Sequence, residues 1–288
     1  MAQLLSGKPV AEAMRLELTA RCEALRERGI LPTLAIVRVG QKPDDLAYER
    51  GAKKRAEQLG VQVHAFSLPE DASQEALLAL IDRLNDDASV HGVLLLRPLP
   101  PHLQLDAIRN RLDPEKDVDG MCDLSAAAIY NGHGGFAPCT AEACIQILAH
   151  YGMECAGKHA VVLGRSTVIG KPVAMLLLQK NATVTICHSK SRQAAQLCTT
   201  ADILVSATGR LCSVTKDFVH EGQTVIDVAI NWDANRPNAA GGLGTIAGDA
   251  DFDEIEPIVE AITPVPGGVG SVTTSILMRH TIEAAEKR

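Results

Sequence analysis

The sequence predicts an α/β protein built from two α/β domains. Short apolar runs alternate with helical patterns along most of the chain, which is typical of a parallel sheet covered by helices on both faces. The alternation is interrupted at residues 130–138, where Gly is frequent, and starts again at His159. The length of 288 residues fits two domains or one large α/β domain.

The first α/β series lies in residues 9–96. Apolar residues at helical spacing predict a helix over 9–28, with Pro9 at a favourable first position and Gly29 at its end. The segment Arg97–Pro101 interrupts the pattern, and its prolines predict a loop after a strand. The elements expected in between are strand 34–39, helix 44–59, strand 61–66, helix 73–84 and strand 93–96.

The second series follows a domain boundary that we place near residue 140. Helices are expected over 140–151 and from Ser271 to the end of the chain. The Gly-, Ala- and Asn-rich segment 233–248 predicts a loop or an irregular hairpin. Strands expected at 159–163, 182–187, 203–205 and 224–228 alternate with helices after Gly170 and Ser191.

Composition and charge exclude several classes of partner. Lys and Arg number 28 against 35 Asp and Glu, and the net charge of −7 gives no global positive field for nucleic acid or an anionic membrane. Aromatic residues make up 3%, which disfavours a base-stacking surface. The N-terminal residues show no signal-peptide pattern, and no stretch reaches the ~18 apolar residues of a membrane span. We therefore expect a cytoplasmic protein.

The eight cysteines carry no metal-site pattern. They include no C-x-x-C pair and no Cys/His cluster at zinc-site spacing. Cys139 and Cys144 are the closest pair, and one C-x4-C spacing selects no metal. We expect free, mostly buried thiols and no bound metal.

Residues 160–172 form a candidate phosphate-binding turn between a strand and a helix. Gly164 and Gly170 lie six residues apart, so the G-x-G-x-x-G fingerprint is absent and a plain tight turn is the alternative. A helix N-terminus here would offer free N–H groups to a phosphate. The next strand ends at His188–Ser191, without the carboxylate typical of an NAD site, and Arg165 offers a cation. This combination favours NADP over NAD, unless Arg165 is only a solvated surface residue.

Two further loops carry a weaker signal. Residues 262–270 place two prolines and three glycines before the final helix, which suits close approach of backbone to a ligand or a structural linker. Lys116–Gly120 sets Asp117 and Asp119 at a turn, and a solvated Asx turn is the simplest interpretation. Neither loop decides a function by itself.

Taken together, these segments resemble the methylenetetrahydrofolate dehydrogenase/methenyltetrahydrofolate cyclohydrolase family. They occur in family order across nearly the whole chain. The matching stretches are Val39-Gly40 with Tyr48, Pro98–Pro100, Lys116–Gly120, Pro138–Thr140, Gly164–Ser166 with Gly170 and Pro172, Cys187–Ser189, Val225–Asn231, Gly248-Asp249 and Ile262–Gly270.

The resemblance implies a folate-binding catalytic domain over 1–140, completed by 264–288, and a Rossmann-like NADP-binding domain over 141–263, with a cleft between them. Tyr48 would stack on the pterin and Asp119 would bind its amino-pyrimidine edge. The substrate is expected to contact Tyr48, Leu96, Arg97, Asp119, Pro266, Gly267, Gly268, Val269 and Gly270. The cofactor is expected to contact Thr140, Gly164, Arg165, Ser166, Ser189 and Ile230. The family is usually homodimeric.

The sequence departs from the family motif at the positions of two catalytic side chains. The family lysine, four residues after the tyrosine and on the same helix face, is replaced by Ala52. The family glutamine before Pro-Leu-Pro is replaced by Leu96, and Arg97 follows where the family has an apolar residue. In the family these two side chains serve the hydrolysis of the methenyl group.

These departures predict an NADP-dependent methylenetetrahydrofolate dehydrogenase whose cyclohydrolase activity is lost or altered. Hydride transfer depends mainly on geometry, whereas hydrolysis needs water activation and proton transfer. One alternative is a divergent enzyme that uses another folate adduct or a non-folate substrate, with Arg97 contacting an anionic group. A second is a non-catalytic folate- or nucleotide-binding subunit. A third is that Lys53 or Lys54 reaches the site and both activities are kept. Cys122, close to Asp119, is expected to be a buried structural thiol.

Overall fold

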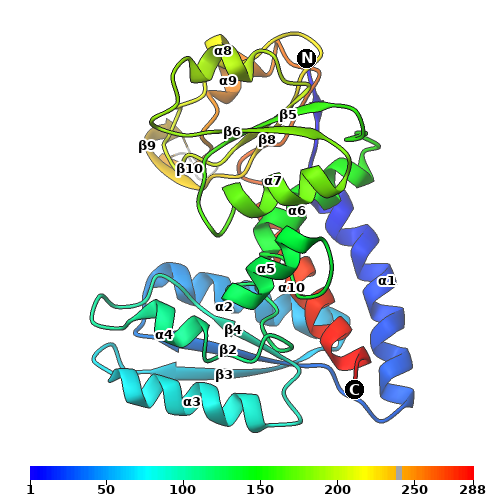
Figure 1. Cartoon of the computed structure of the whole chain (residues 1–288), viewed down its shortest axis with the longest axis vertical. Helices are drawn as coiled ribbons and strands as arrows, with labels where there is room; N and C mark the ends of the chain where they lie inside the picture. Colours follow the sequence, from blue (N-terminus) through cyan, green and yellow to red (C-terminus); the bar gives the residue numbers. More distant parts are fainter. Residues whose placement is uncertain (238–241) are drawn as a thin grey trace. The chain divides into compact units, whose positions relative to one another are not determined.

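The computed structural model describes residues 1–237 and 242–288, and divides into two compact units (Figure 1). Unit 1 contains residues 1–11 and 140–273, and unit 2 contains residues 12–139 and 274–288. Helices α1 (Gly7–Glu27) and α10 (Gly270–Glu286) each begin in unit 1 and continue into unit 2.

Unit 2 is built on a three-stranded parallel sheet in the order β3-β2-β4. The central strand β2 is apolar and almost completely buried, as expected for a parallel strand covered on both faces. Residues of β2 and β4 pack against the apolar face of α3, which presents Leu77, Ile81 and Leu84. The elements are β2 (Thr33–Val39), α2 (Pro43–Leu59), β3 (Gln62–Leu68), α3 (Gln74–Asp86), β4 (Gly92–Leu95), α4 (Leu105–Arg109) and α5 (Asp123–Asn131).

Unit 1 is built on a six-stranded parallel sheet in the order β1-β11-β8-β7-β5-β6. An antiparallel pair, β9 with β10, lies outside this sheet. The strands are β1 (Gln3–Leu4), β5 (His159–Leu163), β6 (Thr183–Cys187), β7 (Ile203–Ser206), β8 (Thr224–Asp227), β9 (Asn231–Pro237), β10 (Leu243–Ala247) and β11 (Ala261–Ile262). The helices are α6 (Cys139–His150), α7 (Gly170–Gln179), α8 (Ala194–Cys198) and α9 (Phe252–Ile255), with a short 3-10 turn at Lys216–Phe218.

The observed units differ from the expected boundaries at both chain ends. Residues 1–11 belong to unit 1 because β1 pairs with β11, with Gln3 beside Ala261. The C-terminal change of unit falls at residues 273–274 rather than 263–264. The expected loop or irregular hairpin at 233–248 contains β9 and β10, with an irregular register between Leu243 and Thr245, while its residues 238–241 lie outside the described part of the chain.

The turn at Lys116–Gly120 is buried, so its first two charged side chains are structural. Lys116 is 1% exposed, and its Nζ donates to the carbonyl oxygens of Leu84, Asn85 and Asp87 at 2.7–2.8 Å. The ammonium group thereby satisfies carbonyls at the C-terminal end of α3.

Asp117 caps the opposite kind of helix end, the N-terminus of α5. It is fully buried, and its carboxylate accepts hydrogen bonds from the Met121 and Cys122 N–H groups and from Ser125 Oγ at the start of α5. The simple interpretation of a solvated turn is therefore wrong for Lys116 and Asp117. Cys122 is buried at this N-terminus of α5, as expected for a structural thiol.

Lys116→Ala is expected to lower the free energy of unfolding by about 2–4 kcal/mol, because it leaves a cavity and three buried carbonyls without their donor. Urea unfolding of the purified variant measures this change. Arg111→Ala is the matched control in unit 2, since it removes only an exposed ion pair with Asp82 and should change the free energy of unfolding far less than Lys116→Ala does. Equal unfolding midpoints for the two variants would contradict the capping role.

Candidate active site

Three predicted substrate residues come together in unit 2. Tyr48 lies on α2, Arg97 follows β4, and Asp119 lies in the turn before α5. Arg97 Nη2 donates a hydrogen bond to Asp119 Oδ2 at 2.8 Å, and each side chain is 20% exposed. Burial raises the pKa of the Tyr48 hydroxyl well above its usual value, and the nearby Cys139 and Asp119 raise it further. Tyr48 is therefore a neutral ring beside a carboxylate.

The backbone around these residues is held by contacts between segments. The Val93 N–H donates to the Lys116 carbonyl at 2.8 Å, which joins β4 to the turn that carries Asp119. Gly120 has φ of +60°, and a Cβ there would lie 2.4 Å from the Phe136 carbonyl oxygen. Only glycine fits this close approach, so the turn fixes where Asp119 lies.

The two positions predicted from the sequence to depart from the family motif are apolar and buried. Ala52 is fully buried within α2, which runs without interruption from Pro43 to Leu59, and Leu96 is 7% exposed. Lys53 is 46% exposed, and its Nζ donates to Glu49 Oε1 at 2.6 Å. No distortion of the helix turns Lys53 toward the position of Ala52.

Glu49 connects Lys53 to the sheet. Its other carboxylate oxygen accepts from Arg38 Nε at 3.0 Å. Burial raises the pKa of Glu49, but the hydrogen bonds from Lys53 and Arg38 outweigh burial and leave the pKa below its usual value. Glu49 is thus an ionised partner of two cations, which keeps Lys53 engaged on this side of α2.

Arg97 is paired within the protein. Because its guanidinium is neutralised by Asp119, it does not present an isolated cation to an anionic substrate. The following residue is also held, since Lys42 Nζ donates to the Pro98 carbonyl oxygen at 2.7 Å. The loop carrying Arg97 is therefore anchored from two sides.

The predicted substrate loop Pro266–Gly270 belongs to unit 1. The Gly7 N–H donates to the Gly267 carbonyl at 2.8 Å, and a Cβ on Gly268 would lie 2.5 Å from the Pro264 carbonyl oxygen. The loop is therefore tightly fixed where α10 begins. Its association with Tyr48 and Asp119, which lie in unit 2, stays a prediction.

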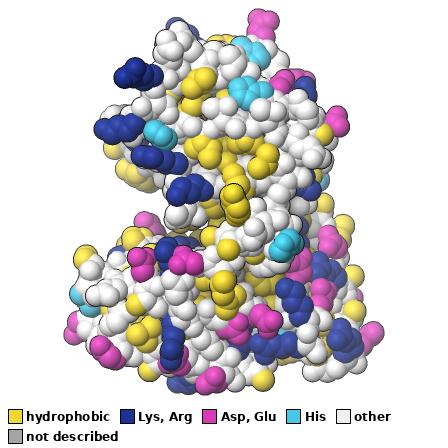
Figure 2. All heavy atoms as spheres, in the orientation of Figure 1, with side chains coloured by type: hydrophobic (Ala, Val, Ile, Leu, Met, Phe, Trp, Pro, Cys, Tyr) yellow, Lys and Arg dark blue, Asp and Glu magenta, His cyan; other side chains and the backbone are white. Residues whose placement is uncertain are grey.

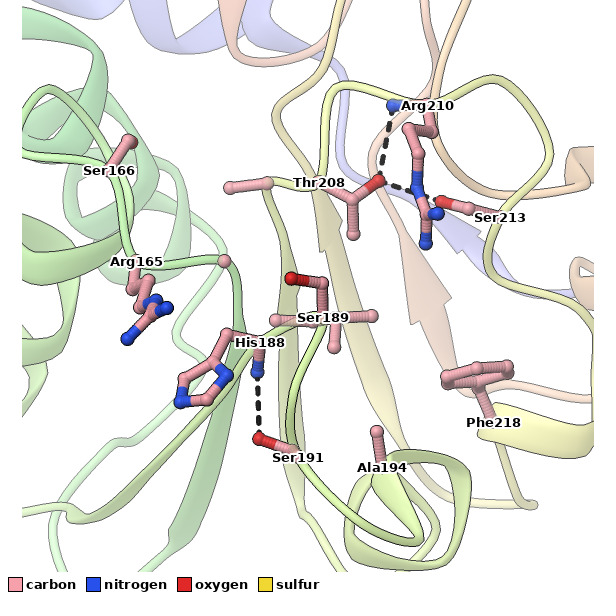
Figure 3. A pocket seen from close by; sticks show the side chains of 13 residues that line it. Arg165, Ser166, His188, Ser189, Ser191, Ala194, Thr208, Arg210, Ser213 and Phe218 are labelled. Carbon is pink, nitrogen blue, oxygen red and sulfur yellow. Dashed lines mark hydrogen bonds between the residues drawn. The ribbon is translucent and has the colours of Figure 1, made fainter.

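A cavity of about 520 Å³ in unit 1 contains four of the predicted cofactor residues (Figure 3). These are Gly164, Arg165, Ser166 and Ser189, brought together because the parallel strands β5 and β6 end at the same edge of the sheet. Sequence reasoning missed the other residues that line the cavity. They are Leu163, His188, Ser191, Ala194, Ala207, Thr208, Arg210, Ser213 and Phe218.

Two predicted cofactor residues lie elsewhere in unit 1. Thr140 is on α6, and Ile230 is 68% exposed just before β9. A Cβ on Gly270 would lie 3.8 Å from Ile230 Cδ1, so Ile230 is near the start of α10. Neither residue lines the 520 Å³ cavity, and their contact with a cofactor stays a prediction.

The spacing of the phosphate-binding turn has a steric reason. Gly164 has φ of +136°, and a Cβ on it would lie 2.3 Å from the Ala207 carbonyl oxygen. A Cβ on Gly170 would lie 2.3 Å from the Gly164 carbonyl oxygen. Ser166 Oγ accepts from the N–H groups of Ile169 and Gly170, which caps the start of α7. The six-residue spacing thus forms a compact turn without the usual fingerprint.

Two buried carboxylates hold the side of the cavity that is formed by Thr208 and Arg210. Asp249 is fully buried and accepts hydrogen bonds from the Thr208 and Arg210 N–H groups at 2.6 and 2.8 Å. Asp227 in turn accepts from the Asp249 and Ala250 N–H groups, and burial raises the pKa of Asp227 to about 6. Asp249 therefore fixes the loop that brings Arg210 to the cavity.

The cavity suits an anionic ligand. Figure 3 shows Arg165 and Arg210 on opposite sides of it, with serine and threonine hydroxyls between them. Among the residues that the structure describes, neither arginine side chain pairs with a carboxylate. Figure 2 shows Lys and Arg side chains along one edge of the visible face of unit 1. Phosphate oxygens accept hydrogen bonds from arginine and hydroxyl groups of this kind.

Other site classes have no support in residues 1–237 and 242–288. No group of three His, Cys, Asp or Glu side chains in these ranges could hold a metal ion, and no helix in them is long and apolar enough to cross a membrane. All eight cysteines are free thiols, and Cys212 alone among them is exposed.

Family models match both parts of the chain. The model of the tetrahydrofolate dehydrogenase/cyclohydrolase catalytic domain matches residues 5–119, and that of the NAD(P)-binding domain of the same family matches residues 138–288. The chain belongs to the tetrahydrofolate dehydrogenase/cyclohydrolase family. The prediction of two α/β domains, one of them Rossmann-like, is confirmed.

Similarity to individual members of the tetrahydrofolate dehydrogenase/cyclohydrolase family covers the full length. The chain is 49% identical to the bifunctional protein FolD of Carboxydothermus hydrogenoformans, over 99% of this chain and 98% of that one. The crystal structure of bifunctional FolD from Campylobacter jejuni is 36% identical and covers 100% of both chains, with a TM-score of 0.94. The Trypanosoma brucei FolD structure, complexed with NADP and an inhibitor, is 34% identical over 99% of this chain and 98% of that one, with a TM-score of 0.92.

Proposed function

We propose that the protein catalyses the NADP-dependent oxidation of 5,10-methylenetetrahydrofolate to 5,10-methenyltetrahydrofolate. The observation that carries this proposal is the meeting of Tyr48 and Asp119 at one site of unit 2, in a chain that also holds the arginine-lined cavity of an NAD(P)-binding domain.

The side chains of unit 2 would bind and orient the folate. Asp119 would accept N–H bonds from the amino-pyrimidine edge of the pterin, a geometry that a carboxylate favours. The ring of Tyr48 would stack on the pterin, and burial keeps its hydroxyl neutral. The product cation is stabilised by its own nitrogens, so orientation supplies most of the catalysis and no general base is required.

The side chains of unit 1 would hold the nicotinamide cofactor, which accepts the hydride when bound. Arg165 and Ser189 suit the 2′-phosphate of NADP, since the strand end at 188–191 carries no carboxylate to repel it. The N–H groups at the start of α7 are taken within the turn, since Ile169 and Gly170 donate to Ser166 Oγ and Lys171 donates to the Ser166 carbonyl. The NADP in the structure of the Trypanosoma brucei relative supports this choice over NAD.

We also propose that cyclohydrolase activity is present but slower than hydride transfer. The relative at 49% identity is a bifunctional protein, which favours both activities over the complete loss of one. Ala52 and Leu96 offer no group that could move a proton, and Lys53 is engaged by Glu49. Hydrolysis without a positioned general base or acid is expected to lose about 100-fold or more in rate.

One assay tests both proposals. Purified protein is mixed with methylenetetrahydrofolate and NADP, and the absorbance of NADPH and of the methenyl product is followed together. We expect NADPH to form and methenyl to accumulate before it decays. NADPH without methenyl accumulation would show fast hydrolysis through other groups, such as Lys53 or Lys54. Absence of NADPH would favour another substrate or a binding role, and Asp119→Ala serves as the inactive control.

We propose in addition that the protein forms a homodimer, in which the β9–β10 pair of one copy packs against the β9–β10 pair of a second copy. Large apolar side chains are exposed on these two strands, with Trp232 at 67% and Leu243 at 71%. Trp232 packs over β10, because a Cβ on Gly244 would lie 2.4 Å from its ring. A fixed, exposed tryptophan with apolar neighbours is typical of the centre of an interface.

Trp232→Ser is expected to weaken self-association about 30-fold or more, because interface tryptophans often contribute 2 kcal/mol or more. Light scattering over a dilution series measures the dissociation constant. Leu16→Ser is the matched control, since Leu16 is 62% exposed on α1. A Trp232→Ser protein that stays as dimeric as the control would place the interface elsewhere.

A further inference from the structure

Arg97 and Asp119 form a pair whose hydrogen-bonding capacity is mostly unused. Within the described part of the chain, the 2.8 Å bond from Arg97 Nη2 to Asp119 Oδ2 is the only hydrogen bond of either side chain. A guanidinium has five N–H donors and no acceptor, and an ionised carboxylate has about four acceptor positions and no donor. The pair therefore presents donors and acceptors side by side.

The two side chains come from anchored backbone. On the arginine side, the Leu96 N–H donates to the Val37 carbonyl at 2.9 Å and Lys42 Nζ holds the Pro98 carbonyl. On the aspartate side, the turn is fixed by buried Asp117 and by the close approach of Gly120 to Phe136. Groups held in this way lose little conformational entropy when a ligand binds.

The donor and acceptor pattern has a defined complement. The pyrimidinone edge of a 2-amino-4-oxo pterin presents a carbonyl oxygen, a ring N–H and an amino N–H in a row. Asp119 can accept from the two N–H groups through oxygen lone pairs that Arg97 leaves unused, and a second N–H of Arg97 can donate to the carbonyl.

We propose that Arg97 is a specificity-determining residue that reads the 4-oxo group of the substrate while it orients Asp119. This inference rests on the proposed folate function and deepens it. An analogue with an amino group at position 4 would place N–H donors opposite the guanidinium of Arg97. The Arg97 N–H that binds the 4-oxo group would then have no acceptor. Sites built to pair with a polar group discriminate strongly against analogues that lack it.

The experiment compares two ligands and three proteins. Affinities for tetrahydrofolate and for its 2,4-diamino counterpart are measured by calorimetry on the wild type, Arg97→Leu and Arg97→Lys. Steady-state KM and kcat with methylenetetrahydrofolate are measured on the same proteins. Arg111→Leu is the control, because it removes an arginine–aspartate pair of unit 2 outside the site.

Arg97→Leu is expected to weaken tetrahydrofolate binding and to raise the substrate KM about 10- to 100-fold, with kcat and the KM for NADP within threefold of the wild type. The preference for the 4-oxo ligand should fall by a similar factor. Arg97→Lys, which keeps a cationic donor group, should retain part of that preference, and Arg111→Leu should change none of these values. An unchanged KM for NADP also shows that the variants are folded.

Three results would overturn the inference. Equal weakening of both ligands by Arg97→Leu would leave Arg97 a role in holding Asp119 only. Unchanged affinities for both ligands in a variant that still oxidises the methylene substrate would remove Arg97 from recognition while the proposed dehydrogenase stands. A wild type that neither binds tetrahydrofolate nor oxidises the methylene substrate would overturn the proposed function itself, and this inference with it.

Discussion

Ala52→Lys is expected to raise the rate of methenyl hydrolysis about 100-fold, while NADPH formation changes less than threefold. Position 52 lies four residues after Tyr48 on an uninterrupted helix, so the new side chain would extend along the same face as the tyrosine. Burial would lower the pKa of an amine placed there, toward the range in which it can exchange protons near neutral pH. A positioned acid–base group typically contributes 10²–10⁴-fold.

The double assay for NADPH and methenyl measures this change directly, because faster hydrolysis removes the methenyl signal without lowering NADPH. Ala52→Met is the matched control, since it adds comparable bulk at a fully buried position without an amine. Lys53→Ala removes the native amine next to position 52 and tests whether that amine takes part in hydrolysis. If Ala52→Lys left hydrolysis unchanged and Lys53→Ala abolished it, the site would work through Lys53 and the interpretation of position 52 would be wrong.

Arg165→Ala is expected to raise the KM for NADP about 10- to 100-fold and to leave the KM for NAD within threefold. Hydrogen bonds to charged groups contribute roughly 1.5–3 kcal/mol, and NAD lacks the 2′-phosphate that Arg165 would bind. Because Arg165 makes no ion pair in the described structure, its removal breaks no salt bridge of the protein. The effect is therefore expected in cofactor selectivity and not in stability.

Steady-state kinetics with both cofactors measure that selectivity. Arg210→Ala is the informative comparison, because Arg210 lies on the opposite side of the cavity (Figure 3) and would meet a part of the cofactor that NAD and NADP share. It should weaken both cofactors equally. Equal weakening of NAD and NADP by Arg165→Ala would show that the 2′-phosphate is read by other residues, such as Ser189.

Local patterns predicted much of the fold and several of the residues that line the cavity in unit 1. The strands at 34–39 and 159–163 could be predicted because buried parallel strands are short apolar runs between helices. The turn at Gly164–Gly170 could be predicted because a glycine pair between a strand and a helix has few structural uses. Tyr48 and Asp119 were predicted as substrate residues through resemblance to a family, which specific strings such as Lys116–Gly120 made possible.

Short elements and long-range pairings were decided only by the tertiary structure. β1 has two residues, too few for any periodicity, and its place in the unit 1 sheet comes from β11, which pairs Gln3 with Ala261. Asp249 and Thr208 are also far apart in sequence, so no local pattern could show that a buried carboxylate fixes one wall of the cavity.

The sequence by itself determined the family and the two α/β domains, because the motifs and the alternating apolar runs that predict them lie in neighbouring residues. The tertiary structure decided what the charged residues do. In the folded chain Lys116 caps the C-terminal end of α3, and Arg97 donates a hydrogen bond to Asp119. A charge is stabilised by whatever the fold brings within hydrogen-bonding distance, and those partners come from separate segments of the chain.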